Sequence, residues 1–272
     1  MPAKSRLHPR SPMTAVNVAG PSAHRPCLVL IPGTLCDARV FKGQARELRQ
    51  VAQVLALSWR DLLGGGGPSK VADPFNRLLD RLPPRFAVAG FSLGGLWALQ
   101  LLARAPDRIE RLALIASNAE AGGPRGQRKN ARLWRLWTAR GPAAVARQCK
   151  PAYFHQRLKQ QRCKELVHQM AVATPPRLAR AQFKWAGQRP DGLQILKETA
   201  PSTLLVSGAR DRLCPRPLQQ RIVAALPSTQ WTELPRCGHF LTWEAPSRLT
   251  SLLKSWLAEP SPISLENALD HT

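Results

Sequence analysis

Short apolar runs alternate with longer amphipathic stretches over the first part of the chain. The run at 27–31, Cys-Leu-Val-Leu-Ile, lies between prolines and has the length of a fully buried strand that ends at the Pro32-Gly33 turn. The same reasoning predicts further strands at 51–57, 86–90 and 111–116, and helices at about 38–49, 71–82 and 94–105. Gly64–Gly67 and Pro68 predict a loop. Strands that alternate with helices of this length favour an α/β fold with a mainly parallel sheet and helices on both faces.

The pattern changes between residues 118 and 200, where only helical periodicity is found. It returns with predicted strands at 203–207 and about 230–234, and helices at about 217–226 and 246–257. We therefore expect an α/β core at 27–117 and 201–258 and an inserted helical cap at 118–200. A disordered lead-in at 1–26 and a mobile tail at 259–272 complete the expected organisation.

The sequence Gly90-Phe91-Ser92-Leu93-Gly94 matches the G-x-S-x-G pattern between a predicted strand and a predicted helix. In that setting the serine occupies a tight turn, and the two glycines remove side chains that would collide with neighbouring backbone. The context favours Ser92 as a nucleophile over a structural turn serine.

A serine hydroxyl needs a general base, and the base needs a carboxylate that fixes its tautomer. Asp211 follows the predicted strand at 203–207, and His239 lies in a loop after the strand at 230–234. The order Ser, Asp, His is that of the nucleophile-elbow hydrolases. The alternatives are a surface acid at 211 and a structural histidine at 239, with Asp191 and Glu120 as weaker substitutes for the carboxylate.

The negative charge that develops on an attacked carbonyl must be met by fixed donors, usually backbone N–H groups. Leu93 follows the nucleophile and is expected to supply one, and Thr34, in the loop after the first strand, the other. Leu35, Trp134 and Trp137 are candidates for lining an acyl pocket, although core packing is the commoner role for such side chains.

Charge narrows the choice of partners. The chain of 272 residues has 40 Lys and Arg against 17 Asp and Glu, a net charge of +23. The basic residues are spread along the whole chain and it has a single tyrosine, which disfavours nucleic acid as the partner. Residues 120–200 hold 17 Lys and Arg against four Asp and Glu. This excess either steers an acidic acyl substrate or an acidic carrier protein, or is an ordinary solvated helical surface.

The remaining composition excludes other classes. Recurrent apolar runs rule out disorder throughout, and none is long enough for a membrane-spanning helix. The six cysteines form no C-x-x-C pair and no zinc-type spacing, so we do not expect a structural metal. The first twenty residues have no apolar signal-peptide region, which favours a cytoplasmic location with reduced thiols, and Met13 is an alternative start.

The regions around Ser92, Asp211 and His239 resemble those of the α/β-hydrolases of the small serine esterase type, and the resemblance extends over about residues 27–257. The matching segments are 91–96, 207–211 and 238–239, and the similarity is greatest to pimeloyl-carrier-protein methyl ester esterases and to menaquinone-pathway and enol-lactone hydrolases. The resemblance implies an acyl-enzyme mechanism without a cofactor, under a helical cap.

The chain departs from the family pattern at Pro32, where many relatives have His, and in the short segment before its first strand. Lactone, thioester or carbon–carbon bond cleavage would use the same three residues. A catalytically silent binding protein on the same scaffold is the alternative from another class.

Overall fold

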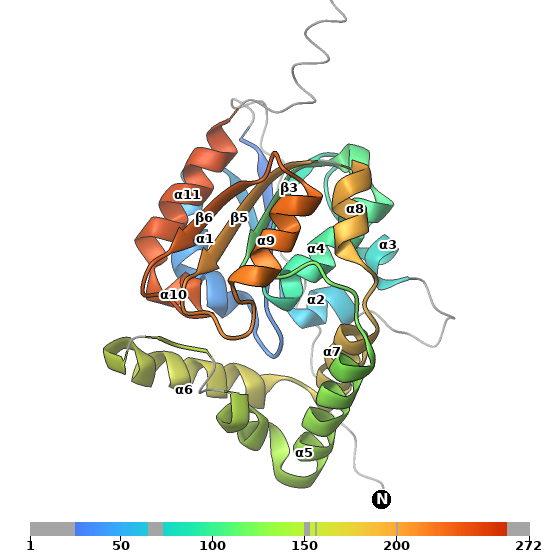
Figure 1. Ribbon diagram of the computed structural model, residues 1–272, viewed down its shortest axis with the longest axis vertical. Helices are drawn as coiled ribbons and strands as arrows, with labels where there is room; N and C mark the ends of the chain where they lie inside the picture. Colours follow the sequence, from blue (N-terminus) through green and yellow to red (C-terminus); the bar gives the residue numbers. More distant parts are fainter. Residues whose placement is uncertain (1–24, 65–72, 150–152, 156, 200, 260–272) are drawn as a thin grey trace, which may run out of the picture.

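A single parallel sheet of six strands forms the centre of the molecule (Figure 1). The structure is a computed structural model that describes residues 25–64, 73–149, 153–155, 157–199 and 201–259. The strand order is β2-β1-β3-β4-β5-β6. The strands are β1 (Cys27–Ile31), β2 (Gln53–Ala56), β3 (Phe86–Phe91), β4 (Ile109–Ile115), β5 (Ser202–Gly208) and β6 (Gln230–Leu234).

Register brings the carboxyl ends of these strands to one edge. Ile31 pairs with Gly90, Phe91 with Ile115, and Gly208 with Leu234. The loops that carry the predicted site residues after β1, β3, β5 and β6 therefore start from the same edge. The predicted mainly parallel sheet is confirmed.

Successive strand residues point to opposite sides of the sheet. Both faces are apolar, and helices cover each of them. Val88 belongs to a cluster formed with α2 (Trp59–Leu63), α3 (Pro74–Leu79), α4 (Leu93–Arg104), α8 (Gly192–Thr199) and α9 (Arg216–Ala225). Its neighbours Ala87 and Ala89 belong to a second cluster, formed with the 3₁₀ helix η1 (Ala38–Phe41), α1 (Lys42–Leu48), α10 (Leu241–Glu244) and α11 (Pro246–Ala258). The short 3₁₀ helix η2 (Pro106–Arg108) leads into β4.

Three helices between β4 and β5 lie below the sheet in Figure 1, and we call them the cap helices. They are α5 (Pro124–Cys149), α6 (Arg157–Ala173) and α7 (Pro176–Gln188). Helix α5 is kinked at Gly141, whose φ is 74°, directly before Pro142. Helix α5 packs against α6 and α7, whereas α8 returns to the core beside α4 and α9. In the described part of the chain, no helix combines the length and apolarity needed to cross a membrane.

Most predicted elements differ from the observed ones only at their ends. The predicted helix at 38–49 begins as η1 before it continues as α1. Two short helices, α2 and α10, were not predicted. The expected disorder at 1–24, the loop at 65–68 and the mobile tail at 260–272 lie outside the described residues.

Candidate active site

Ser92 lies at the turn between β3 and α4 with φ 53° and ψ −116°, a strained conformation for a residue other than glycine. The turn requires close backbone approach: a side chain at Gly94 would collide with the carbonyl of Ile31. Ser117 Oγ donates a hydrogen bond of 2.7 Å to the Ser92 carbonyl. The strained turn is thus fixed from β1 and from the end of β4.

The loops after β5 and β6 are bonded to each other. The Ala209 N–H donates to the Leu234 carbonyl at 3.0 Å, and the Arg210 N–H donates to the Cys237 carbonyl at 2.9 Å. At Gly208 the absence of a side chain leaves room for the backbone at 237–238. These backbone hydrogen bonds bring the loop with Asp211 next to the loop with His239.

The structure brings Ser92, His239 and Asp211 into one hydrogen-bonded chain. His239 Nε2 lies 2.9 Å from Ser92 Oγ, and His239 Nδ1 lies 2.8 Å from Asp211 Oδ2. The second carboxylate oxygen, Oδ1, accepts the N–H groups of Leu213 at 2.8 Å and Cys214 at 3.0 Å. The two weaker candidates for the carboxylate lie in other contacts. Asp191 accepts a hydrogen bond from the Leu193 N–H, and Glu120 pairs with Arg221.

Burial and charge act in opposite directions on the pKa of Asp211. Its side chain and that of His239 are almost wholly buried. Desolvation raises the pKa of Asp211, but the charge and hydrogen bond of His239 and the two backbone N–H groups lower it, and the net shift is downward. The carboxylate is therefore suited to remain ionised beside the imidazole.

Asp211, Cys214 and His239 are the one group of possible metal ligands in the described part of the chain. Both ring nitrogens of His239 already have partners, Asp211 and Ser92. Burial, and then the charge of Asp211, raises the pKa of the Cys214 thiol to about 12, whereas a metal needs the thiolate. The arrangement suits proton transfer better than metal binding.

The loop after β1 lies against the serine. A side chain at Gly33 would come within 3.3 Å of the Cβ of Ser92. The Cys36 N–H donates to the Gly33 carbonyl at 3.1 Å, which closes a turn around Thr34 and Leu35, the latter with φ 56°. Leu93 is the first residue of α4, where N–H groups have no partner within the helix. Leu93 thus follows Ser92 directly, and Thr34 follows the glycine that lies against Ser92.

Glu244, which sequence reasoning missed, connects the histidine loop to the cap. Its carboxylate is buried and accepts the Gly238 N–H at 3.0 Å and the His155 N–H at 2.9 Å. The His239 N–H donates to the Tyr153 carbonyl at 2.8 Å, and the Tyr153 ring stacks on the imidazole at 6.1 Å. The segment 153–155, between α5 and α6, therefore helps to position His239.

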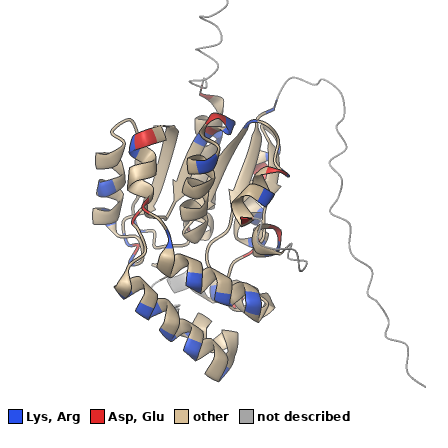
Figure 2. Cartoon of the chain, turned by 90° about the vertical axis from the view of Figure 1, so that its right-hand side faces the viewer, with Lys and Arg blue, Asp and Glu red and all other residues tan. Residues whose placement is uncertain are grey.

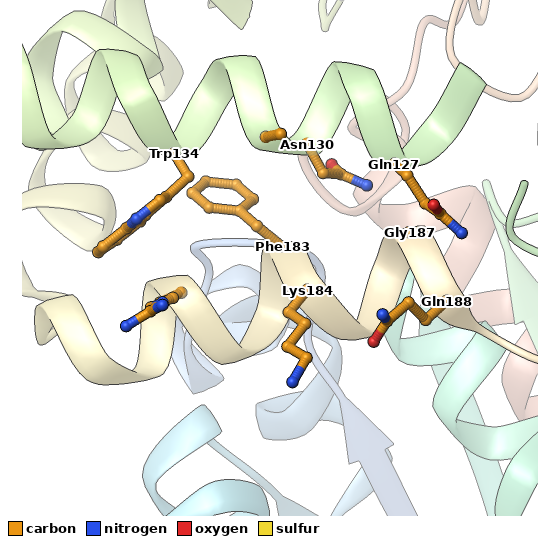
Figure 3. Close-up of a pocket in the computed structure, with 9 residues that line it drawn as sticks. Gln127, Asn130, Trp134, Phe183, Lys184, Gly187 and Gln188 are labelled. Atoms are coloured by element: carbon orange, nitrogen blue, oxygen red, sulfur yellow. The ribbon is translucent and has the colours of Figure 1, made fainter. Parts of the chain in front are cut away.

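The three predicted pocket residues lie in one apolar region, where Trp134 stacks on Trp137 with ring centroids 6.5 Å apart. Trp137 packs with Leu35 and Phe183 in an apolar cluster of the cap. On the outer side of this cluster, Trp134 and Phe183 line a hollow of about 260 Å³ between α5 and α7, which has no triad residue in its wall (Figure 3). Arg180 lies over the Trp134 ring at 5.8 Å. Leu35 and Trp137 remain candidates for contact with an acyl group, and the position of Trp134 favours it less.

Comparison with known proteins defines the class. The profile of the alpha/beta hydrolase family matches residues 28–251. The chain belongs to this family, as its sheet and its strained serine turn indicate.

Individual relatives narrow the comparison. A pimeloyl-[acyl-carrier protein] methyl ester esterase of Nitrosomonas europaea is 36% identical over 97 residues, which cover 34% of this chain and 37% of that protein. The matched region thus spans less than two fifths of the length of that relative. The protein of the same name from Chromobacterium violaceum is 28% identical over 239 residues, 80% of this chain and 90% of that one.

Solved structures share the fold. A thermophilic esterase from Thermogutta terrifontis has a TM-score of 0.77 at 23% identity and covers 85% of this chain and 89% of its own. The enol-lactonase from Burkholderia xenovorans LB400 has a TM-score of 0.76 at 22% identity, with 87% and 93% covered. At these identities the likeness concerns the architecture alone.

Proposed function

We propose that the protein hydrolyses carboxylic esters through an acyl-enzyme intermediate. Ser92 Oγ attacks the ester carbonyl carbon while His239 Nε2 accepts the hydroxyl proton. The tetrahedral intermediate collapses, the carbon–oxygen bond to the alcohol breaks, and His239 returns the proton to the leaving alcohol. Water then attacks the acyl-enzyme by the same route and releases the acid and free Ser92.

The observation that carries this proposal is the unbroken chain Ser92–His239–Asp211, with distances of 2.9 and 2.8 Å. Asp211 holds the Nδ1–H tautomer, which leaves Nε2 free to accept the serine proton. A silent binding protein has no need for two aligned hydrogen bonds at a strained serine.

Thr34 and Leu93 are proposed as the oxyanion donors, because a developing charge is stabilised by N–H groups that are already fixed in place. For the same function we propose that the segment 118–200 acts as a cap over the active site, and that residues 27–117 and 201–258 form the core. Leu35 and Trp137 would contact the acyl group.

The substrate we propose is an acyl methyl ester carried by an acidic carrier protein. Two observations support it: relatives bear the name pimeloyl-[acyl-carrier protein] methyl ester esterase, and the cap is strongly basic. In Figure 2, Lys and Arg positions, coloured blue, recur along the cap helices. Opposite charges on two proteins raise their rate of encounter, most strongly at low salt.

The test is a substrate panel with wild type, Ser92→Ala and the matched control Ser251→Ala, an exposed serine of α11. We expect hydrolysis of p-nitrophenyl esters by wild type and the control, and none above background by Ser92→Ala with the fold intact. Unchanged turnover in Ser92→Ala would refute the mechanism. In the same panel, a lactone or thioester cleaved faster than any ester would redirect the substrate class.

A carrier-bound methyl ester and the same acyl methyl ester without carrier test the partner. We expect a higher kcat/KM for the carrier-bound ester, by an excess that falls as salt is raised. Equal values at all salt concentrations would exclude the carrier protein and leave the free ester as substrate.

A further inference from the structure

Gln182 of the cap helix α7 accepts one hydrogen bond from the loop after β1. The Leu35 N–H donates to Gln182 Oε1 at 2.8 Å, across 147 positions of sequence. Gln182 is 1% exposed, so water does not compete with this bond. Since only the amide oxygen can accept an N–H, the bond also fixes which way the amide faces.

With the amide oxygen of Gln182 facing Leu35, its NH₂ group is left in a buried position. Among the described residues, Gln182 Nε2 has no hydrogen-bond partner although it is buried. An unpaired buried donor destabilises a protein by about 1–3 kcal/mol. The bond to Leu35 is retained in spite of that cost.

Leu35 itself is strained. It occupies the third position of the turn from Gly33 to Cys36 with φ 56°, where glycine is favoured. Its side chain is 7% exposed and packs in the cap cluster with Trp137 and Phe183. Such a conformation persists only where its surroundings enforce it, and here the surroundings are the cap.

The two peptide groups that flank Thr34 are each fixed by a hydrogen bond. The Gly33 carbonyl accepts from Trp59 Nε1 of α2 at 2.8 Å. In a trans peptide the C=O and N–H point to opposite sides, so this bond directs the Thr34 N–H away from Trp59. The next peptide is fixed by Gln182 through the Leu35 N–H.

We propose that Gln182 is a positioning residue that holds the Thr34–Leu35 peptide, so that the cap keeps the turn that carries the Thr34 N–H in one conformation beside Ser92. The inference rests on the proposed function and deepens it. Without the bond, the Thr34–Leu35 peptide can rotate and Leu35 relaxes towards negative φ, so the turn that carries the Thr34 N–H is no longer held in one conformation at the oxyanion site. The Gln182 amide touches no reacting atom and acts only through the loop after β1.

The test uses p-nitrophenyl acetate, whose short acyl chain requires little contact with the cap. Gln182→Leu removes the acceptor, and Gln182→Asn keeps an amide that is one methylene too short to reach Leu35. Gln182→Glu keeps an acceptor oxygen. The matched control is Gln188→Leu, an exposed glutamine of the same helix.

We expect kcat to fall about ten- to a hundred-fold in the Leu and Asn variants with KM within about twofold, since loss of a whole oxyanion donor costs 10²–10³-fold. Affinity for a trifluoromethyl ketone, which mimics the tetrahedral intermediate, should fall in parallel with kcat/KM. Gln182→Glu should restore kcat to within a few-fold of wild type, and Gln188→Leu should match wild type.

Wild-type kcat in both the Leu and Asn variants, or an effect confined to KM, would overturn the inference. If Gln182→Leu does not fold, the comparison of Asn with Glu decides alone. Failure of this inference is separable from failure of the proposed function, because Ser92→Ala is inactive whenever the proposed function holds, whatever Gln182 does.

Discussion

Replacement of Glu244 tests how the cap helps to position the histidine. Its two carboxylate oxygens accept the Gly238 and His155 N–H groups at 3.0 and 2.9 Å, and its side chain is buried. Hydrogen bonds to a charged group contribute about 1.5–3 kcal/mol each. In Glu244→Gln one oxygen becomes an NH₂ group that faces an N–H donor, so one of the two bonds is lost.

We expect Glu244→Gln to lower the free energy of unfolding by about 2 kcal/mol, which for a chain of this size lowers Tm by roughly 4–8 °C. Glu244→Ala leaves both N–H groups unpaired and should lower it further. Because Gly238 precedes His239, kcat/KM should fall about tenfold or more in both variants. Thermal unfolding followed by circular dichroism and p-nitrophenyl ester kinetics measure the two effects.

The matched control is Glu165→Gln, an exposed glutamate of α6 that should leave both quantities at their wild-type values. If Glu244→Gln and Glu244→Ala both kept wild-type Tm and kcat/KM, the connection between the histidine loop and residues 153–155 would contribute nothing. A fall in Tm with unchanged kinetics would limit Glu244 to a structural role.

Three further predictions concern the residues around Asp211. Asp211→Asn should lower kcat by about 10³–10⁴-fold, since the amide favours the wrong tautomer of His239, and a loss below tenfold in ester kinetics would contradict this. Because the folded-state pKa of Asp211 is lowered, its carboxylate adds stability that is present above about pH 4 and lost as pH falls through the folded pKa. Urea midpoints of wild type and Asp211→Asn should therefore converge as pH is lowered below 4, and a constant gap would show that this linkage is absent. The Cys214 thiol, with its pKa raised to about 12, is about one part in ten thousand thiolate at pH 8, so iodoacetamide should label it in the unfolded protein and not in the native one, as peptide mass spectrometry would reveal.

Local patterns were sufficient to predict the sheet and the three residues that meet at its edge. Strands 86–90 and 203–207 were recognisable as buried apolar runs, and parallel strands place their following loops at one edge. The strand order was not predicted, because it depends on which strands pair across the chain. Helix α2 was missed although Ser58 and Asp61 form a capping box, a signal visible in the sequence.

The roles of Gln182 and Glu244 had no such signal. Each makes its contact over a long sequence separation, 147 positions for Gln182 with Leu35 and 89 for Glu244 with His155. A buried glutamine or glutamate looks like a surface residue in the sequence, since only tertiary packing removes it from water. The catalytic roles, the domain limits and the cytoplasmic location stay predictions.

Labelling with a fluorophosphonate probe, followed by intact-protein and peptide mass spectrometry, tests the central claim most directly. A nucleophile activated by His239 should take up one probe per chain on the peptide that contains Ser92, and Ser92→Ala should take up none. His239→Ala should slow the labelling by orders of magnitude. A label on another residue, or undiminished labelling of Ser92→Ala, would contradict the account.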